Sequence, residues 1–460
     1  MPASYQQAVA QLLELGHELQ QTPARKFDLA NMRVLLEALA HPERRFPSVL
    51  IAGTNGKGST AAALASILRA AGYETGLYTS PHLVRVNERI RINDEEISDA
   101  EFSEIHGRVE DAVGALIARG QLPWHPSFFE MLTAMAFEYF ASVGIEIAVL
   151  EVGMGGRLDA TNVVDPCVAV ITDIALDHQN FLGNTIPEIA AEKAGIIKPG
   201  GVVVTLPQHP EASDIIGRAI LEQNARAVSA AEYVPGLSPQ ADPLNMVENS
   251  DLETRTCFHM RYPLVVLGEP IEIDSPLIGR HQLRNVALAI AAAVELRSFG
   301  FNITPQIISG GIRQTTWPGR FQVIPPTRDF PECVLDVAHN PAGAWALRST
   351  LATFYSGRPL TFVFGAMRDK AVREMAEILF PLAERVIVTR ANSPRAADPE
   401  EIRAAAAHTG AQIESRPEVK AALSRAREMT SHNGLVVITG SIYVVGEALE
   451  YLNSISARAA

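Results

Sequence analysis

Residues 53–60 read Gly53-Thr54-Asn55-Gly56-Lys57-Gly58-Ser59-Thr60, and this stretch of the 460-residue chain decides the fold. The apolar run before it, residues 48–52, predicts a buried strand, and the alanine-rich run at 61–71 predicts a helix. Glycines let a backbone wrap closely around phosphate oxygens, and the start of a helix directs N–H groups at them. The segment is therefore a candidate phosphate-binding loop in which Lys57 adds a positive charge.

The spacing of this loop differs from the common GxxxxGK[ST] pattern, because Ile51 stands where the first glycine is expected. Gly58 also displaces Ser59 by one position from the usual metal-binding hydroxyl, so a metal ligand has to come from elsewhere. A glycine-rich turn without a ligand is the alternative interpretation. We expect the whole loop to bind nucleotide phosphates, through Gly53, Thr54, Asn55, Gly56, Lys57, Gly58 and Ser59.

Short apolar runs alternate with amphipathic stretches along the rest of the chain, which is typical of an α/β fold with a mainly parallel sheet. Prolines interrupt the pattern between residues 207 and 280, and Thr304 is the predicted N-cap of a helix that opens a second region. We therefore predict an N-terminal domain at 1–301 and a smaller Rossmann-like α/β domain at 302–460. The predicted strands are 75–79, 145–151, 168–172, 202–206, 333–337, 360–364, 385–388 and 435–439, and the predicted helices include 128–143, 186–197 and 282–297.

The formal net charge of −13, from 39 Lys and Arg against 52 Asp and Glu, argues against non-specific nucleic-acid binding. The three cysteines are far apart in sequence, so neither a disulfide framework nor a structural zinc site is indicated. No apolar run approaches the roughly 20 residues that span a bilayer, and the N-terminus lacks the features of a signal peptide. We expect a soluble cytoplasmic protein.

Polar side chains follow several predicted strands, at the edge where ligands collect in open α/β sheets. Glu151 ends one strand and could hold Mg²⁺, although a salt-bridged acid explains it as well. His178 follows another strand and could equally be structural, and Lys193 alone predicts only a solvated helical charge. In the second domain, Arg320 lies on a turn suited to phosphate, and Asp336 follows a strand.

Two classes of function remain from these residues alone. One is an ATP-dependent enzyme that binds its nucleotide between two domains, and the other is a nucleotide switch or motor. A guanine-nucleotide switch would carry an NKxD segment, and the sequence contains none. His178, Arg320 and Asp336, in separate βα contexts, favour the enzyme.

The ordered motifs resemble folylpolyglutamate synthases, including the bifunctional dihydrofolate synthase/folylpolyglutamate synthases, within the Mur ligase superfamily. The resemblance covers nearly the whole chain and implies a P-loop, Mur-ligase-like ATPase domain followed by a glutamate ligase domain. It also implies ATP-dependent joining of L-glutamate to dihydropteroate, to the γ-carboxylate of folyl glutamates, or to both, through an acyl phosphate. The segments that carry it are 53–59, 78–83, 128–130, 151–162, 177–183, 192–197, 317–321 and 336–341.

The resemblance assigns roles to residues one by one. It implies that Ser80 and Glu151 hold one Mg²⁺, that His178 and Glu151 hold a second, and that Lys193 is carbamylated. It further implies that ATP contacts Asn285, Arg320 and Asp336, and that His339 lies near the γ-phosphate. We expect Lys57, His178, Lys193 and His339 to be the catalytic residues.

The family match also implies a pocket for dihydropteroate, in which an aromatic ring stacks on the pterin and a carboxylate accepts its N–H groups. Its expected residues are Ser127, Phe128, Phe129, Glu130, Leu158, Asp159 and Ala160. One of the two phenylalanines is expected to be core. The sequence departs from the family at Ala30-Asn31, at Val337 and in extra length around 235–256, which affects substrate range more than reaction type.

Two alternatives remain beside this interpretation: a Mur-type ligase that acts on a cell-wall precursor, and an ATP-driven binding module. The family's usual monomeric state is our expectation.

Overall fold

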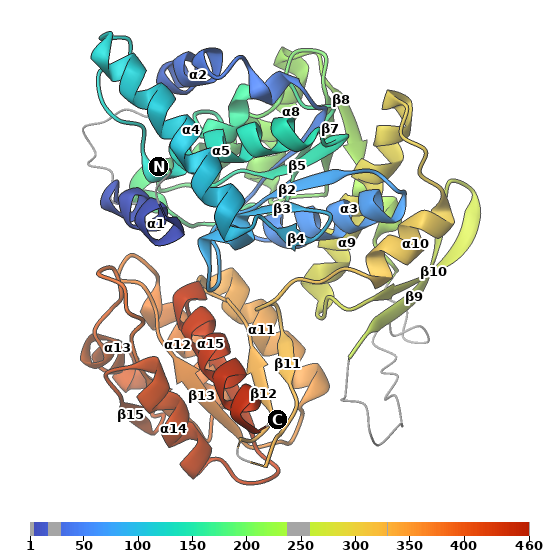
Figure 1. Ribbon diagram of the computed structural model, residues 1–460. Helices are drawn as coiled ribbons and strands as arrows, with labels where there is room; N and C mark the ends of the chain where they lie inside the picture. The colour runs from blue at the N-terminus through green and yellow to red at the C-terminus, as the bar shows by residue number, and fades with distance from the viewer. Residues whose placement is uncertain (1–3, 17–28, 237–257, 329, 460) are drawn as a thin grey trace. The chain divides into compact units, whose positions relative to one another are not determined.

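The computed structural model describes residues 4–16, 29–236, 258–328 and 330–459 (Figure 1). The chain forms two compact units. The first contains residues 1–236, 263–273 and 284–315, and the second contains 237–262, 274–283 and 316–460. The first unit thus extends beyond residue 301, because helix α10 (Pro305–Arg313) packs on helix α3 (Lys57–Ala70). The division into functional domains stays a prediction.

The first unit is built on an eight-stranded sheet in the order β4-β3-β2-β5-β1-β6-β7-β8. Strand β1 (Ser48–Ala52) lies between β5 (Ile147–Glu151) and β6 (Val168–Ile171), and all three run parallel. Parallel strands end at the same edge, so the segments after these three strands lie next to one another. The other strands are β2 (Thr75–Tyr78), β7 (Val202–Thr205), β8 (Arg226–Ser229) and the antiparallel β3 (Ile90–Ile92) and β4 (Glu95–Glu96).

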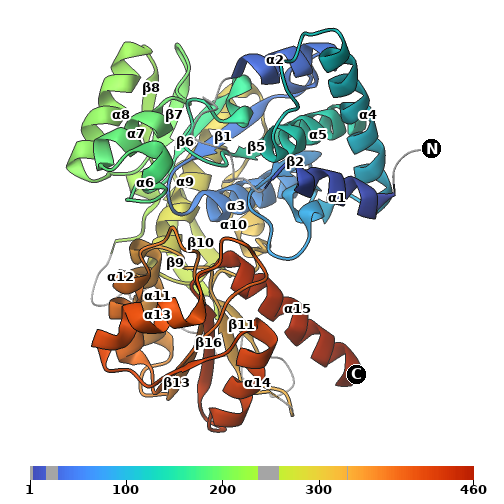
Figure 2. The same cartoon turned by 90° about the vertical axis from the view of Figure 1, so that its left-hand side faces the viewer.

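Helices cover both faces of this sheet. A bundle of α1, α2, α4 and α5 packs on one face, and α3 with α10 forms a second layer (Figures 1 and 2). Ser66 donates from Oγ to the carbonyl oxygen of Gly311 across 2.7 Å, and the missing side chain of Gly311 lets α10 approach the α3 backbone. The other helices of this unit are α1 (Tyr5–Glu14), α2 (Leu29–Ala38), α4 (Asp99–Ala118), α5 (Phe128–Val143), α6 (Gln179–Leu182), α7 (Ile186–Ala194), α8 (Pro210–Glu222) and most of α9 (Arg280–Leu296).

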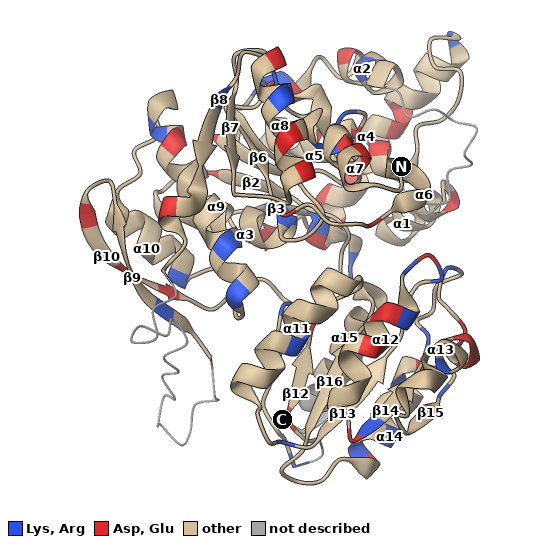
Figure 3. Ribbon diagram, turned by 180° about the vertical axis from the view of Figure 1, so that it is seen from behind, with Lys and Arg blue, Asp and Glu red and all other residues tan. Residues whose placement is uncertain are grey.

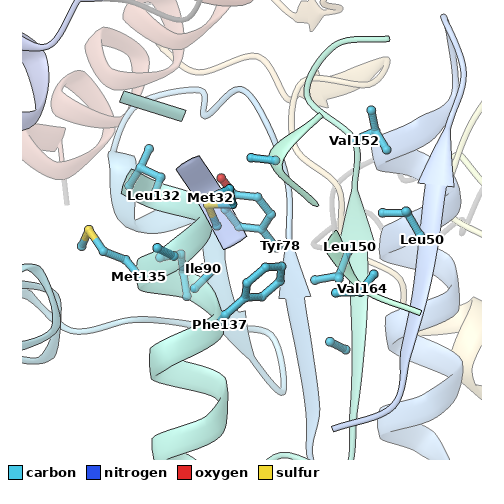
Figure 4. Packing of buried hydrophobic residues seen from close by; sticks show 14 of the residues in the cluster. Met32, Leu50, Tyr78, Ile90, Leu132, Met135, Phe137, Leu150, Val152 and Val164 are labelled. Carbon is cyan, nitrogen blue, oxygen red and sulfur yellow. The ribbon is translucent and has the colours of Figure 1, made fainter. Parts of the chain in front are cut away.

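A hydrophobic core lies between the sheet and α5. Successive side chains of a strand point to opposite faces of the sheet, so alternate residues of each strand contribute to this core. Leu50, Tyr78 and Leu150 point from neighbouring strands toward Phe137 of α5, and all four are fully buried (Figure 4). Burying side chains of this size contributes about 1.5–3 kcal/mol each. This packing holds the strand ends, and the residues that follow them, at fixed positions.

The second unit contains a six-stranded sheet in the order β11-β12-β16-β13-β14-β15, parallel except for β11. This is the Rossmann-like arrangement expected for the region. Its strands are β11 (Gln322–Ile324), β12 (Cys333–Leu335), β13 (Leu360–Phe364), β14 (Arg385–Val388), β15 (Ile413–Ser415) and β16 (Leu435–Thr439). Its helices are α11 (Pro341–Phe354), α12 (Val372–Leu379), α13 (Pro399–Ala406), α14 (Val419–Met429) and α15 (Ile442–Ala459). A separate hairpin pairs β9 (Met260–Val266) with β10 (Glu269–Ser275).

The sequence predictions of the main elements are confirmed within a few residues. Four strands, at 48–52, 360–364, 385–388 and 435–439, and the helix at 128–143 match their predicted bounds, and Thr304 caps α10 as expected. The helix predicted at 61–71 instead begins at Lys57, because the glycine-containing loop residues themselves form its first turn. Most of the extra length around 235–256 lies outside the described residues.

Charged residues of both signs are interspersed over the ribbon of each unit in the view of Figure 3. No helix among the described residues is long and apolar enough to cross a membrane.

Candidate active site

The predicted phosphate loop connects β1 to α3, and its geometry suits an anion. Gly56 is the N-cap of α3 with φ of 90°, a left-handed conformation that glycine adopts without strain. The N–H groups of Lys57, Gly58 and Ser59 have no acceptor within the helix, because the first turn of any helix leaves its donors unpaired. These amides and the positive end of the helix dipole together suit a phosphate group.

The first half of the loop is hydrogen-bonded to the segment that follows the neighbouring strand β6. The N–H groups of Thr54 and Asn55 donate to the carbonyl oxygen of Asp173 at 2.9 and 3.2 Å. The hydroxyl of Thr54 donates to Ala175 O at 3.0 Å and accepts from Ala175 N at 3.1 Å. These two amides are occupied, so the amides suited to a phosphate group are those of the later half.

Asn285 of α9 lies against the loop, and its contact with ATP stays a prediction. A Cβ added to Gly56 would overlap Oδ1 of Asn285, so the two residues are in direct contact. The backbone oxygen of Asn285 also accepts from Thr60 Oγ1 at 3.3 Å. The Lys57 ammonium, meanwhile, donates to Thr54 O at 3.3 Å and stays within the loop.

Lys193 is buried beneath the phosphate loop. Its Nζ donates to the carbonyl oxygen of Gly53 at 2.7 Å, and the residue is only 4% exposed. Burial and then the nearby charge of Lys57 lower its pKa to about 7, while Asp177 and Asp159 act in the opposite direction. The interpretation of Lys193 as a solvated surface lysine is therefore wrong.

Ser80 and Glu151 meet at the ends of β2 and β5. The Ser80 N–H donates to Glu151 Oε2 at 3.1 Å, and Glu151 is 4% exposed. Glu151 is the register partner of Ile51, two residues before the loop begins. Among the described residues, no group of three or more His, Cys, Asp or Glu side chains could hold a metal ion. Mg²⁺ does not require such a cage, since one or two carboxylates with substrate phosphates and waters suffice.

His178 and Asp177 follow β6 by way of residues 173–176. His178 has a left-handed backbone with φ of 50°, and its N–H donates to Asp177 Oδ1 at 2.8 Å. Its Nε2 lies 4.0 Å from Asp177 Oδ2. Asp173, whose carbonyl oxygen accepts from the loop amides, follows the same strand, so His178 belongs to the same edge of the sheet.

The expected pterin-binding segment at the start of α5 divides into capping and aromatic residues. Ser127 and Glu130 form a capping box: Glu130 Oε2 accepts from Ser127 N at 2.8 Å, and Ser127 Oγ accepts from Glu130 N at 3.3 Å. Phe128 is core at 4% exposure, with the Arg89 guanidinium 5.2 Å from its ring centre. Phe129 is half-buried between Tyr78 and Gly153. A Cβ added to Gly153 would lie 2.5 Å from the Phe129 ring.

Asp159 holds the glycine-rich segment after β5. Its Oδ1 accepts from Thr161 N and Oγ1 at 3.0 and 2.5 Å, and its Oδ2 accepts from Met154 N at 3.0 Å. Burial raises the pKa of this carboxyl, while these donors act to lower it. Its neighbours Leu158 and Ala160 are half-buried and buried. Asp159 thus has a structural task that explains its presence without a ligand, and a pterin contact stays a prediction.

The remaining expected residues lie in the second unit. Asp336 accepts from Phe321 N and Ala338 N, both at 2.9 Å, and is 8% exposed. Burial raises its pKa, and the nearby Arg320 guanidinium acts to lower it. The Nδ1–H of His339 donates to Val337 O at 2.9 Å, and this hydrogen bond fixes the orientation of the ring. Arg320 lies just before β11, whereas Asp336 and His339 follow β12, the strand that pairs with β11.

Comparison with known proteins identifies this arrangement. Residues 129–293 match the Mur ligase middle domain, and residues 319–442 match the Mur ligase glutamate ligase domain. The chain is 34% identical over 423 residues to a dihydrofolate synthase/folylpolyglutamate synthase of Bacillus subtilis, covering 91% of this chain and 93% of that protein. The chain belongs to the dihydrofolate synthase/folylpolyglutamate synthase family.

Solved members of this family have the same fold. Mycobacterium tuberculosis folylpolyglutamate synthase, complexed with ADP and AMPPCP, superposes with a TM-score of 0.79 at 33% identity, over 96% of this chain and 98% of that one. An Escherichia coli relative, in complex with DHPP and ADP, gives a TM-score of 0.80 at 28% identity, over 98% of both chains. The α/β architecture, the family resemblance and the ligase class predicted from the sequence are confirmed.

Asp173 and Arg284 are two site residues that the sequence reasoning missed. Asp173 O accepts from two loop amides, and Arg284 forms an ion pair with the Asp173 carboxylate. Position directly after a strand was a usable signal for Asp173. Arg284 is one of several charges on a helix and carries no such signal.

Proposed function

We propose that the protein uses ATP to join L-glutamate to dihydropteroate and to the γ-carboxylate of folyl glutamates. The family it belongs to performs ATP-dependent glutamate addition to folates. The observation that carries the proposal is the contact set of one loop: amides at the start of α3, Asn285 against Gly56 and Lys193 on Gly53. The relatives solved with ADP and with DHPP support nucleotide and pteridine as ligands.

The reaction follows from the charges involved. The acceptor carboxylate attacks the γ-phosphorus of ATP, and ADP leaves, which forms an acyl phosphate on the acceptor. The amine of glutamate then attacks the acyl carbon, loses a proton and displaces phosphate. Phosphate-loop amides and Lys57 hold the phosphates for in-line attack, and Arg320, Asp336 and His339 are proposed to contact the nucleotide.

The donors near the loop fit Mg²⁺. Ser80 and Glu151 would hold one ion, and Glu151 with His178 would hold a second, each with substrate oxygens and water completing the shell. Bound Mg²⁺ supplies neutralisation of the charge on the reacting anions. Lys193 fits carbamylation, because a lysine whose pKa is about 7 is, near neutral pH, uncharged and nucleophilic in a substantial fraction of molecules, unlike an ordinary lysine. We propose that its carbamate completes the anionic side of this site.

The pteridine is proposed to lie on Phe129, the half-buried member of the aromatic pair, with Asp159 and its segment alongside. Phe128 is excluded from this role because its ring is in the core. A cell-wall Mur-type substrate has no such support from these residues.

Pure protein incubated with ATP, Mg²⁺ and radiolabelled glutamate tests the proposal. Label is expected in the product when dihydropteroate or a folyl monoglutamate is the acceptor, and the two acceptors assayed side by side separate one activity from two. Hydrolysis of ATP without incorporation into either acceptor would favour a binding module. Incorporation only into a UDP-linked peptide precursor would favour a cell-wall ligase.

A further inference from the structure

Asp173, after β6, and Arg284, near the start of α9, form an ion pair across 111 residues of sequence. Arg284 Nε lies 3.1 and 3.0 Å from the two carboxylate oxygens, and Nη2 lies 2.5 Å from Oδ1. The same Nη2 donates to Pro207 O at 3.0 Å. A guanidinium that binds both oxygens of a carboxylate fixes orientation as well as distance.

Each partner of this pair is attached to a different half of the phosphate loop. The carbonyl oxygen of Asp173 accepts from Thr54 N and Asn55 N. Arg284 precedes Asn285, whose side chain contacts Gly56 and whose backbone oxygen accepts from Thr60. The ion pair therefore connects the two halves of the loop. The first half is bonded to the segment after β6, the second half contacts α9, and the ion pair joins that segment to α9.

The backbone around Asp173 is held on its other side by Gln208. Gln208 Oε1 accepts from Ile174 N at 3.1 Å, and Gln208 Nε2 donates to Thr172 O at 3.0 Å. Asp173 consequently has little freedom to follow a displaced helix. The guanidinium of Arg284 is thus one of the contacts that fix α9 relative to the loop, beside those that Asn285 makes with Gly56 and Thr60.

The ion pair also has an electrostatic consequence for an anionic ligand. An unpaired Asp173 carboxylate next to the loop would repel phosphate, and Arg284 neutralises that charge. The side chains are 32% and 35% exposed, so salt screens part of the effect. We infer that Arg284 and Asp173 are positioning residues that keep the phosphate loop at the width a nucleotide requires, an inference that rests on the proposed function.

Isothermal titration with ADP and Mg²⁺ tests this inference on the full chain and on Arg284→Met, Asp173→Asn and the double variant. Arg284→Met is expected to weaken ADP binding about tenfold, and Asp173→Asn about threefold. The double variant is expected to bind nearly as well as Asp173→Asn, because no carboxylate remains uncompensated. In turnover assays of Arg284→Met, KM for ATP should rise while kcat stays nearly unchanged. The loss of ADP affinity in this variant should be smaller at high salt.

A matched control is available at the other end of the same helix, where Glu295 pairs with Arg226. Arg226→Met and Glu295→Gln are expected to leave ADP affinity unchanged. Equal weakening in these controls would show that any damage to α9 suffices and would overturn the inference. Wild-type affinity in Arg284→Met, or purely additive losses in the double variant, would also overturn it.

If Arg284→Met fails to fold, Arg284→Lys serves as the second variant. Lysine keeps the positive charge but lacks the two guanidinium nitrogens that bind the Asp173 carboxylate. Intermediate affinity supports positioning by the guanidinium, and wild-type affinity contradicts it. If the unaltered protein binds no ADP, the proposed function fails and the inference fails with it. If the unaltered protein binds ADP and the variants match it, only the inference fails.

Discussion

Lys193 Nζ donates a hydrogen bond of 2.7 Å to the carbonyl oxygen of Gly53, so a buried lysine of α7 is attached to the first residue of the phosphate loop. An amine in this position affects both the stability of the fold and the chemistry at the loop.

Lys193→Ala is expected to reduce glutamate incorporation at least about a hundredfold, because both the proposed carbamate and the contact to Gly53 are lost. Partial rescue by formate or acetate, measured as turnover against added carboxylate, would support the carbamate. Unchanged turnover without additive would remove Lys193 from the mechanism.

The stability of ligand-free protein in CO₂-free buffer should depend on the charge of Lys193. Its pKa is lowered from 10.5 to about 7 by folding, so between these pH values the unfolded chain binds a proton that the folded chain has released. Stability therefore rises with pH through this window, by up to about 1.4 kcal/mol per pKa unit. The free energy of unfolding of Lys193→Met, measured with denaturant, should not rise in this way. The stability of this variant relative to the unaltered protein should therefore be highest below pH 7. Parallel pH profiles for the two proteins would contradict the assignment.

Gly56→Ala is expected to weaken ADP binding by at least about a hundredfold. Its φ of 90° strains any other residue, and the new Cβ would overlap Asn285. Gly200→Ala is the matched control, since Gly200 also has a positive φ of 66° but has no atom within 4 Å of the added Cβ. Titration with ADP should separate the two variants even if both lose similar stability. Equal affinities would show that the contact with Asn285 is unimportant.

Glu151→Gln preserves an acceptor for Ser80 N but removes the negative charge at the end of β5. The Mg²⁺ concentration that gives half-maximal turnover should therefore rise about tenfold or more. Glu138→Gln, which removes a partner of Arg108 from α5 of the same unit, serves as the control and should leave the Mg²⁺ requirement unchanged. A coincident Mg²⁺ titration for Glu151→Gln and the unaltered protein would argue against this ligand.

Gly153→Ala places a methyl group 2.5 Å from the Phe129 ring, so the ring has to shift. We expect KM for the pteridine acceptor to rise about tenfold while KM for ATP stays unchanged. Gly107→Ala, on α4 with open space around the added Cβ, provides a comparison that should change neither constant. Equal changes in both KM values for Gly153→Ala would indicate general damage instead of a displaced ring.

The buried strands could be predicted because each is a short apolar run bounded by turn residues, as at residues 48–52. Strands β8 and β15 escaped because their residues are polar or partly exposed, and their pairing depends on neighbours distant in sequence. Ser127 and Glu130 could have been identified as a capping box from their spacing, which is a local signal.

Candidate site residues could be predicted where they stand at the end of a strand, as Glu151 does. The Asp173–Arg284 ion pair was not, because only the packing of α9 brings the two side chains together. Metal occupancy, the lysine carbamate, the cytoplasmic location and the monomeric state stay predictions.

The acidic strand β4 has a consequence for how the protein behaves at high concentration. It forms one border of the eight-stranded sheet, and both of its residues, Glu95 and Glu96, are exposed. An open border of a sheet offers unpaired backbone groups to any other strand, including that of a second molecule. Glu96 is in an ion pair with Arg91 at 3.7 Å, so the Glu95 carboxylate is the main charge that repels the same border of a neighbouring copy and opposes the edge-to-edge sheet growth from which fibrous aggregates form.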